Sequence, residues 1–96
     1  MNDEILDFIK KRFSNTDANW LYGNCYYFAQ ILCMRFPWLK IYYEPVAGHF
    51  IAGTPSHYYD WRGLVTNQLD SKPILLDWIK DNEPNWYNRL LEDCIL

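Results

Sequence analysis

Apolar residues recur every three to four positions at the start of the chain, which is the spacing of one helical stripe. Asn2 or Asp3 can cap such a helix, and acidic residues follow in its first turn, as expected near a helix N-terminus. The pattern predicts an amphipathic helix over residues 3 to 13 and then a loop over residues 14 to 23. The stripe consists of Ile5, Leu6, Ile9 and Phe13.

A second helical pattern runs from about residue 24 to residue 36 and stops before Pro37, since the residue before a proline disfavours the helical conformation. Tyr27, Ile31 and Met34 extend its apolar surface beyond a single face. A helix that is apolar on several sides is typically central, so we expect packing on more than one side. The main apolar face carries Cys25, Phe28, Ala29, Leu32, Cys33 and Phe36.

Three short segments rich in β-branched and aromatic residues predict antiparallel strands over residues 40 to 44, 49 to 52 and 57 to 61. The last two strands are joined by Gly53-Thr54-Pro55-Ser56, a four-residue turn composition. A symmetric turn would pair Ala52 with His57, Ile51 with Tyr58, Phe50 with Tyr59 and His49 with Asp60. Directly opposed residues share a face, with Cβ atoms about 4.5–5.5 Å apart.

The remaining sequence is less regular. Residues 64 to 70 predict a loop, with a short strand at residues 64 to 66 as an alternative. Prolines in the first turn favour helices over about residues 71 to 80 and 83 to 93. The whole chain, residues 1 to 96, therefore predicts one α+β domain: a central helix on an antiparallel sheet of three to four strands, with helices flanking it at both ends.

The composition and charge of the chain restrict the classes of protein and partner that fit it. The chain has 96 residues, is 50 % hydrophobic and 19 % aromatic, and so predicts a packed core. Its net charge is −3 and its basic run is Lys10-Lys11-Arg12, so we expect no nucleic-acid partner. The acidic N-terminus and the lack of a long apolar stretch predict a cytoplasmic protein without a membrane partner. Three cysteines without a short-spaced pair indicate neither a disulfide framework nor a zinc knuckle.

A thiol, an imidazole and a carboxylate occur in an order that suits nucleophilic acyl chemistry. Cys25 opens a helix, where unpaired N–H groups and the macrodipole favour a thiolate. His49 would act as base and then as acid, and Asp60 opposite it would fix its tautomer. The ring of Trp61 would exclude water from this contact.

The loop before Cys25 supplies candidates for substrate binding. Asn24 would cap the helix and leave its first amides free to bind an oxyanion, and Asn19, six residues before Cys25, would offer a second donor. Trp20 and Tyr22 either fill the core or line a cleft for a peptide or another amide-bearing substrate.

The same residues also have structural explanations. Free cysteines are often buried, so Cys25 can belong to the core, as we assign Cys33 and Cys94. His49 can be an ordinary strand histidine, and Asp60 can simply end a strand. A metal site built from Cys25, His49, His57 and Asp60 has a suitable composition but no clustered ligand spacing. We therefore expect no metal and no other cofactor.

The order of motifs resembles the papain-like cysteine hydrolase superfamily, in its transglutaminase-like and NlpC-type branches, over about residues 19 to 63. The resemblance implies a papain-like core in which Cys25, His49 and Asp60 form a catalytic triad. Asn19 takes the place of the oxyanion glutamine of papain-type proteases. The matching segments are Asn24-Cys25-Tyr26-Tyr27-Phe28-Ala29, Gly48-His49-Phe50-Ile51 and Tyr58-Tyr59-Asp60-Trp61-Arg62-Gly63.

Two functions from different classes follow. The first is a cysteine-dependent hydrolase or acyltransferase that acts on an amide, peptide or isopeptide bond of a peptide or protein substrate. The second is a non-catalytic interaction or inhibitor protein on the same scaffold, which binds a protein partner through its aromatic surface.

Overall fold

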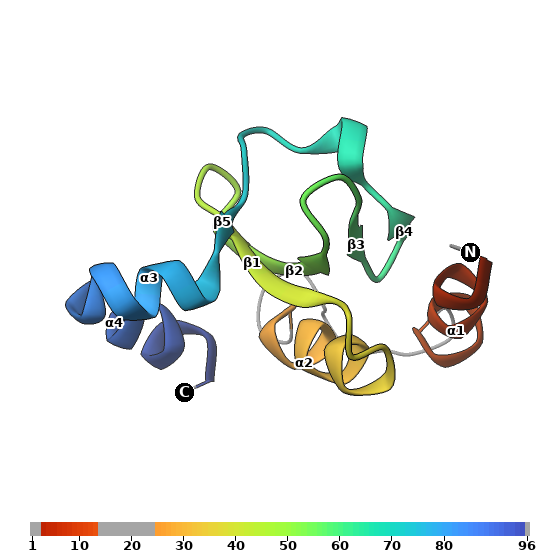
Figure 1. The fold of residues 1–96 in the computed structure, drawn as a ribbon, viewed down its shortest axis with the longest axis horizontal. Helices are drawn as coiled ribbons and strands as arrows, with labels where there is room; N and C mark the ends of the chain where they lie inside the picture. Colours follow the sequence, from red (N-terminus) through yellow and green to blue (C-terminus); the bar gives the residue numbers. More distant parts are fainter. Residues whose placement is uncertain (1–2, 14–24, 96) are drawn as a thin grey trace.

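The computed structural model describes residues 3–13 and 25–95. In this part of the chain four helices and five strands form a compact α+β unit (Figure 1). In chain order the elements are α1 (Asp3–Phe13), α2 (Cys25–Arg35), β1 (Lys40–Glu44), β2 (His49–Gly53), β3 (Tyr58–Asp60), β4 (Gly63–Leu64), the 3₁₀ turn η1 (Thr66–Gln68), β5 (Ile74–Leu75), α3 (Leu76–Asn82) and α4 (Pro84–Ile95).

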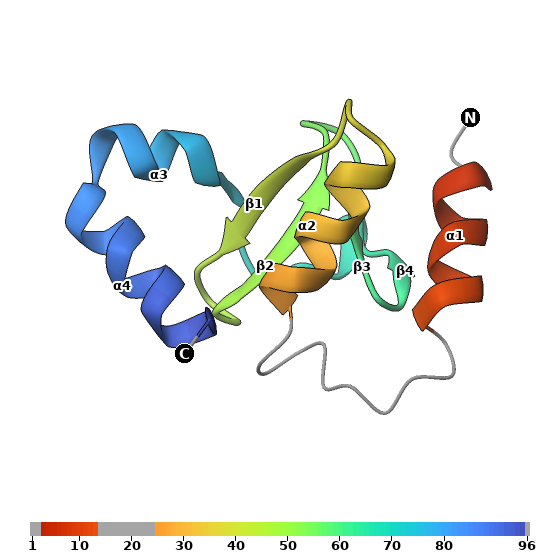
Figure 2. The ribbon, with the colours of Figure 1, turned by 90° about the horizontal axis from the view of Figure 1, so that it is seen from below.

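The five strands form one antiparallel sheet in the order β4-β3-β2-β1-β5. Helix α2 packs on one face of this sheet, with α1 on one side of it and the α3–α4 pair on the other (Figure 2). The segment from η1 to β5 crosses the opposite face (Figure 1). The predicted α+β class and the central helix are confirmed, but the papain-like core is not.

Both faces of the sheet are apolar, and each has its own core cluster. On the α2 side, Phe28 and Leu32 pack against Phe50, Ala52 and Tyr59 of the sheet. The cluster on the opposite face consists of Tyr42, Ile51, Tyr58 and Val65, with Leu69 and Leu75 packed against it. This arrangement follows from the alternation of side chains along each strand.

The register of β2 and β3 differs from the prediction by two residues. Ala52 lies opposite Tyr59, where the symmetric turn would have placed His57. The turn is shifted because the Thr54 N–H donates to the His57 carbonyl at 2.8 Å and because Thr54 Oγ1 accepts the His57 N–H. The same register, continued, sets Asp60 opposite Ile51 and not opposite His49.

The C-terminal part contains an edge strand that the sequence did not predict. Ile74 and Leu75 pair with Tyr43 and Tyr42 of β1, so α3 begins at Leu76 and not near residue 71. The strand predicted as an alternative at residues 64 to 66 is confirmed only at Leu64, since β4 covers Gly63–Leu64 and η1 begins at Thr66. None of the helices in the described part has the length and apolar composition needed to cross a membrane.

Helix α2 is packed on the sheet side and open on its outer side. Tyr27, Ile31 and Met34 are 39 %, 40 % and 75 % exposed. The expectation that these residues would be packed was therefore wrong. The sheet, with α1 and the α3–α4 pair to the sides, leaves them uncovered in the described part of the chain. We call these three residues the α2 stripe.

Candidate functional site

Cys25 is the first residue of α2, and its thiol is directed into the core. The residue is 4 % exposed and belongs to the cluster between α2 and the sheet. The backbone N–H of Phe50 donates a hydrogen bond to Cys25 Sγ, with N and S 3.5 Å apart. The sulfur therefore joins the helix start to β2 as an acceptor for a strand amide.

His49 opens β2, but its side chain lies on the other face of the sheet. Phe50 and Ala52 contact the α2 cluster, whereas Ile51 belongs to the opposite cluster, and alternation places His49 with Ile51. His49 is 4 % exposed, and both ring nitrogens are buried without a hydrogen-bond partner among the described residues. The structure thus does not bring the imidazole of His49 onto the face that holds Cys25.

Asp60 is fully buried in β3, and its hydrogen bonds in the described part of the chain go to Arg62. Oδ1 accepts the Arg62 backbone N–H at 2.8 Å, and Oδ2 accepts the side-chain Nη2 and Nε at 2.6 and 3.1 Å. The hydrogen bond with Asp60 raises the pKa of Arg62. The predicted Asp60–His49 hydrogen bond is not formed, because the carboxylate is held by the turn that follows its own strand.

A second buried carboxylate, Glu44, lies directly across from His49 in the β1–β2 register. Its Oε1 accepts the Val46 N–H at 2.8 Å and also the Ser71 hydroxyl, and its Oε2 accepts the Ala47 N–H at 2.6 Å. Burial would raise the pKa of Glu44, but these hydrogen bonds and the charge of His49 outweigh burial and lower it. The sequence pattern did not single out Glu44, although a carboxylate at the end of a strand rich in aromatic residues was the available signal.

Together, Glu44, His49 and Asp60 form a buried polar cluster on the sheet face away from α2. Burial lowers the pKa of His49, and the charges of Asp60 and Glu44 offset this only in part. Burial thus favours the neutral form of the imidazole, although two carboxylates lie near it, and both of these are hydrogen-bonded to other groups. The described residues contain no group of three His, Cys, Asp or Glu side chains that could hold a metal ion. Within it, Glu44 joins the β1–β2 turn to Ser71, and Asp60 joins β3 to Arg62.

The other residues singled out in the sequence are spread over the molecule. Asn19, Trp20, Tyr22 and Asn24 lie outside the described residues. Trp61 is partly buried against the core cluster, and the Arg62 guanidinium lies 4.7 Å from the centre of its ring. The structure thus places Trp61 beside the Asp60–Arg62 pair. It does not place it over a His–Asp contact.

Of the remaining named side chains, that of Cys94 lies outside the part of the chain whose side chains the structure describes, and those of Cys33 and His57 have ordinary surroundings. Cys33 is partly buried beside α3 and α4, and burial raises its pKa to about 11. His57 belongs to the β2–β3 turn, where its Nδ1 lies 3.0 Å from the hydroxyl of Ser56. Neither side chain joins Cys25 or the buried polar cluster.

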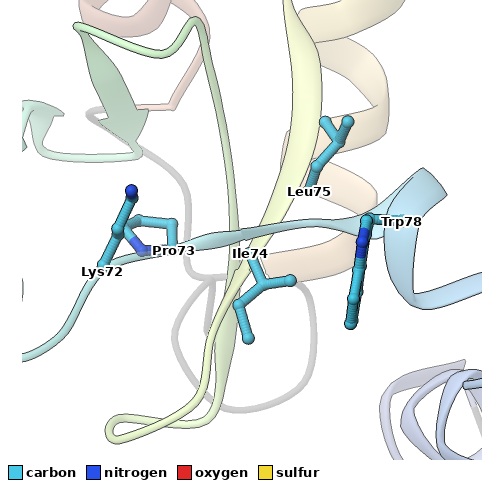
Figure 3. A pocket seen from close by; sticks show the side chains of 5 residues that line it. All are labelled: Lys72, Pro73, Ile74, Leu75 and Trp78. Carbon is cyan, nitrogen blue, oxygen red and sulfur yellow. The ribbon is translucent and has the colours of Figure 1, made fainter. Parts of the chain in front are cut away.

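A further apolar pocket, of about 510 Å³, lies beside the edge strand β5 (Figure 3). It is lined by Lys72, Pro73, Ile74, Leu75 and Trp78. Figure 3 shows Ile74 and the indole of Trp78 extending in the same direction from β5 and α3. The strand edge here is only two residues long and is preceded by a proline, which limits pairing with another strand.

These features define a small α+β protein with one helix-on-sheet core, a buried polar cluster on the far side of the sheet and an uncovered apolar helix face. A family model described as Phage YunG-like protein matches residues 5–92. Since this match spans most of the sequence, the chain belongs to the Phage YunG-like family.

The family match corrects the resemblance inferred from the motif order. The chain is not a member of the papain-like or transglutaminase-like families, and the description as a papain-like cysteine protease was wrong. The comparison with curated proteins gave no match, and the comparison with solved structures gave none either.

Proposed function

We propose that this protein is a non-catalytic binding protein that contacts a protein partner through the outer face of α2. The observation that carries the proposal is the α2 stripe: Tyr27, Ile31 and Met34 stand four and three residues apart and are all exposed. Single exposed apolar residues are common on protein surfaces. Three on one helical face form a contiguous patch, which is typical of interaction sites.

The surroundings of the three candidate catalytic residues favour binding over catalysis. A cysteine nucleophile requires an accessible thiol with a base within hydrogen-bond reach. Cys25 Sγ instead accepts an amide N–H in the core, and His49 lies on the other face of the sheet. The hydrolase hypothesis stays a prediction, and the reactivity of the Cys25 thiol tests it.

The proposal is tested by selecting binders from a library of helical peptides against the folded wild-type chain. We expect the selected peptides to lose binding to the double variant Ile31→Gln/Met34→Gln, because its glutamines keep similar length and helix propensity but remove apolar area. Val46→Gln is the matched control, since Val46 is exposed and apolar but lies in the β1–β2 turn. Selected peptides that bind the double variant as well as the wild type would refute the proposal.

A further inference from the structure

We infer that the partner segment is an amphipathic α-helix with acidic flanks, which lies along α2 between two basic rims. This inference rests on the proposed function and names the chemistry of the partner. Helix α2 has 11 residues and so offers about 16 Å of length, or three turns, to a second helix. A docking helix would present apolar residues at positions i, i+4 and i+7 to the α2 stripe.

The two rims are pockets on opposite sides of α2. The first, of about 310 Å³, lies between α1 and the end of α2, and its lining combines Lys11, Arg12 and Arg35 with Glu4 and Asp7, a net formal charge of +1. The second, of about 290 Å³, lies between α2 and the α3–α4 pair and contains Lys40 and Lys80 together with Asp77, again a net formal charge of +1. Figure 2 shows α1 and the α3–α4 pair on either side of α2, so a helix above α2 would have cations on both flanks.

Charge is distributed unevenly between this surface and the rest of the protein. The two pockets contain five of the nine lysines and arginines but only three of the twelve acidic residues. Their net formal charge is therefore positive, whereas the whole chain carries −3. None of the five cations forms an ion pair with another described residue, since the pair present there joins Asp60 and Arg62. An acidic partner would neutralise the remaining excess of two positive charges.

Aromatic rings hold two of these cations in place. The Arg35 guanidinium lies 4.9 Å from the ring centre of Phe36 and 5.9 Å from that of Phe8. Lys80 Nζ lies 5.9 Å from the ring centre of Tyr87. Contacts of this kind restrict the side chains before a partner arrives, so less conformational entropy is lost on binding.

Two other occupants fit these observations less well. Single-stranded nucleic acid also prefers basic grooves, but it requires aromatic platforms for its bases. The α2 stripe offers Tyr27 together with the aliphatic Ile31 and the thioether Met34. A second copy of the chain would bring the same basic rims together, and like charges across an interface are unfavourable.

The test uses two synthetic helical peptides of about 18 residues with identical leucine positions, one with glutamates and one with lysines on both flanks. Fluorescence anisotropy measures binding to the wild-type chain at about 50 mM and about 300 mM salt. We expect the acidic peptide to bind about tenfold more tightly at low salt, with a smaller advantage at high salt. Arg35→Glu/Lys80→Glu should remove that advantage, and Lys72→Glu, at the exposed edge near β5, should keep it.

The possible contrary results distinguish a failure of the inference on charge from a failure of the proposed function. If both peptides bind equally and Ile31→Gln/Met34→Gln abolishes both, the inference on charge is wrong and the proposed function stands. If neither peptide binds but the library yields peptides specific for the α2 stripe, the inference alone is again overturned. If no helical peptide recognises the stripe, both fail. An oligonucleotide that binds the same surface more tightly than the acidic peptide would also overturn the inference.

Discussion

His49 is buried in the core, and its protonation is therefore linked to the stability of the fold. Its pKa is lowered in the folded protein, so the unfolded chain binds a proton more readily than the native chain does near the ordinary histidine pKa of about 6.5. His49 therefore does not affect the free energy of unfolding above about pH 6.5, and it lowers that free energy as the pH falls below this value.

Urea unfolding between about pH 8 and pH 5 measures this effect. We expect the free energy of unfolding to fall over the acidic half of the range in the wild type. His49→Gln should flatten that slope, whereas His57→Gln, which changes the only other histidine, should preserve it. An identical slope in wild type and His49→Gln would contradict the assignment.

Glu44 should contribute to stability through its acceptor oxygens. Glu44→Gln replaces one carboxylate oxygen by an amide group, so one of the donors Val46, Ala47 and Ser71 loses its acceptor. We expect a loss of about 1–3 kcal/mol in the free energy of unfolding. Glu92→Gln, on the exposed surface of α4, should change it by less than about 0.5 kcal/mol. Equal effects at the two positions would contradict this role.

Cys25 should react slowly with thiol reagents in the folded protein. Its sulfur is buried and accepts the Phe50 amide, so alkylation should be much slower in the native than in the urea-unfolded chain. Mass spectrometry of partly labelled protein follows each thiol separately. Fast native labelling of Cys25 that slows in His49→Ala would favour the hydrolase hypothesis over a binding function.

The sequence predicted where Cys25 and His49 lie along their helix and strand, but it did not predict which residues their side chains contact. Cys25 begins α2 and His49 begins β2, as their local patterns indicate. Their faces could not be predicted, because both sides of the sheet are apolar. Tyr42 and Tyr43 are neighbours on β1, yet each belongs to a different cluster. Because side chains on both faces of the sheet are apolar, their alternation along the strands did not indicate the face on which α2 packs.

At the scale of elements, the β2–β3 turn determines the register between β2 and β3, and so the position of Asp60 relative to His49. Gly53 is required there because an added Cβ would overlap the His57 carbonyl oxygen and approach the Tyr58 ring. We expect Gly53→Ala to destabilise the protein by about 1–3 kcal/mol in denaturant unfolding. Ser56→Ala, at an exposed position of the same turn, should have little effect. A Gly53→Ala variant as stable as the wild type would contradict the observed register.

Element boundaries were predictable where the pattern was local. The N-terminal helix was expected over residues 3 to 13 and is observed there as α1. The edge strand β5 was missed because its pairing with β1 connects segments about thirty residues apart, and because Pro73 was interpreted as a helix start. Proline is also accepted before an edge strand, so composition alone does not distinguish these two roles.

At the scale of the whole molecule, the order of motifs proved a poor guide to family. Cys, His and Asp in sequence order are compatible with a triad, yet this fold distributes them over both faces of one sheet. The α+β class was predictable because it depends on summed periodicity over many residues. The open face of α2 was not, since a helix that is apolar all round is equally consistent with full burial.

The most direct test of the central claim is chemical-shift mapping of the isotope-labelled chain with peptides selected for binding. The account predicts shift changes centred on Tyr27, Ile31 and Met34 and extending to the rims of α1 and α3. The matched variant Ile31→Gln/Met34→Gln should show none of them. Changes confined to the pocket around Trp78, or to Cys25 and His49, would contradict binding through the outer face of α2.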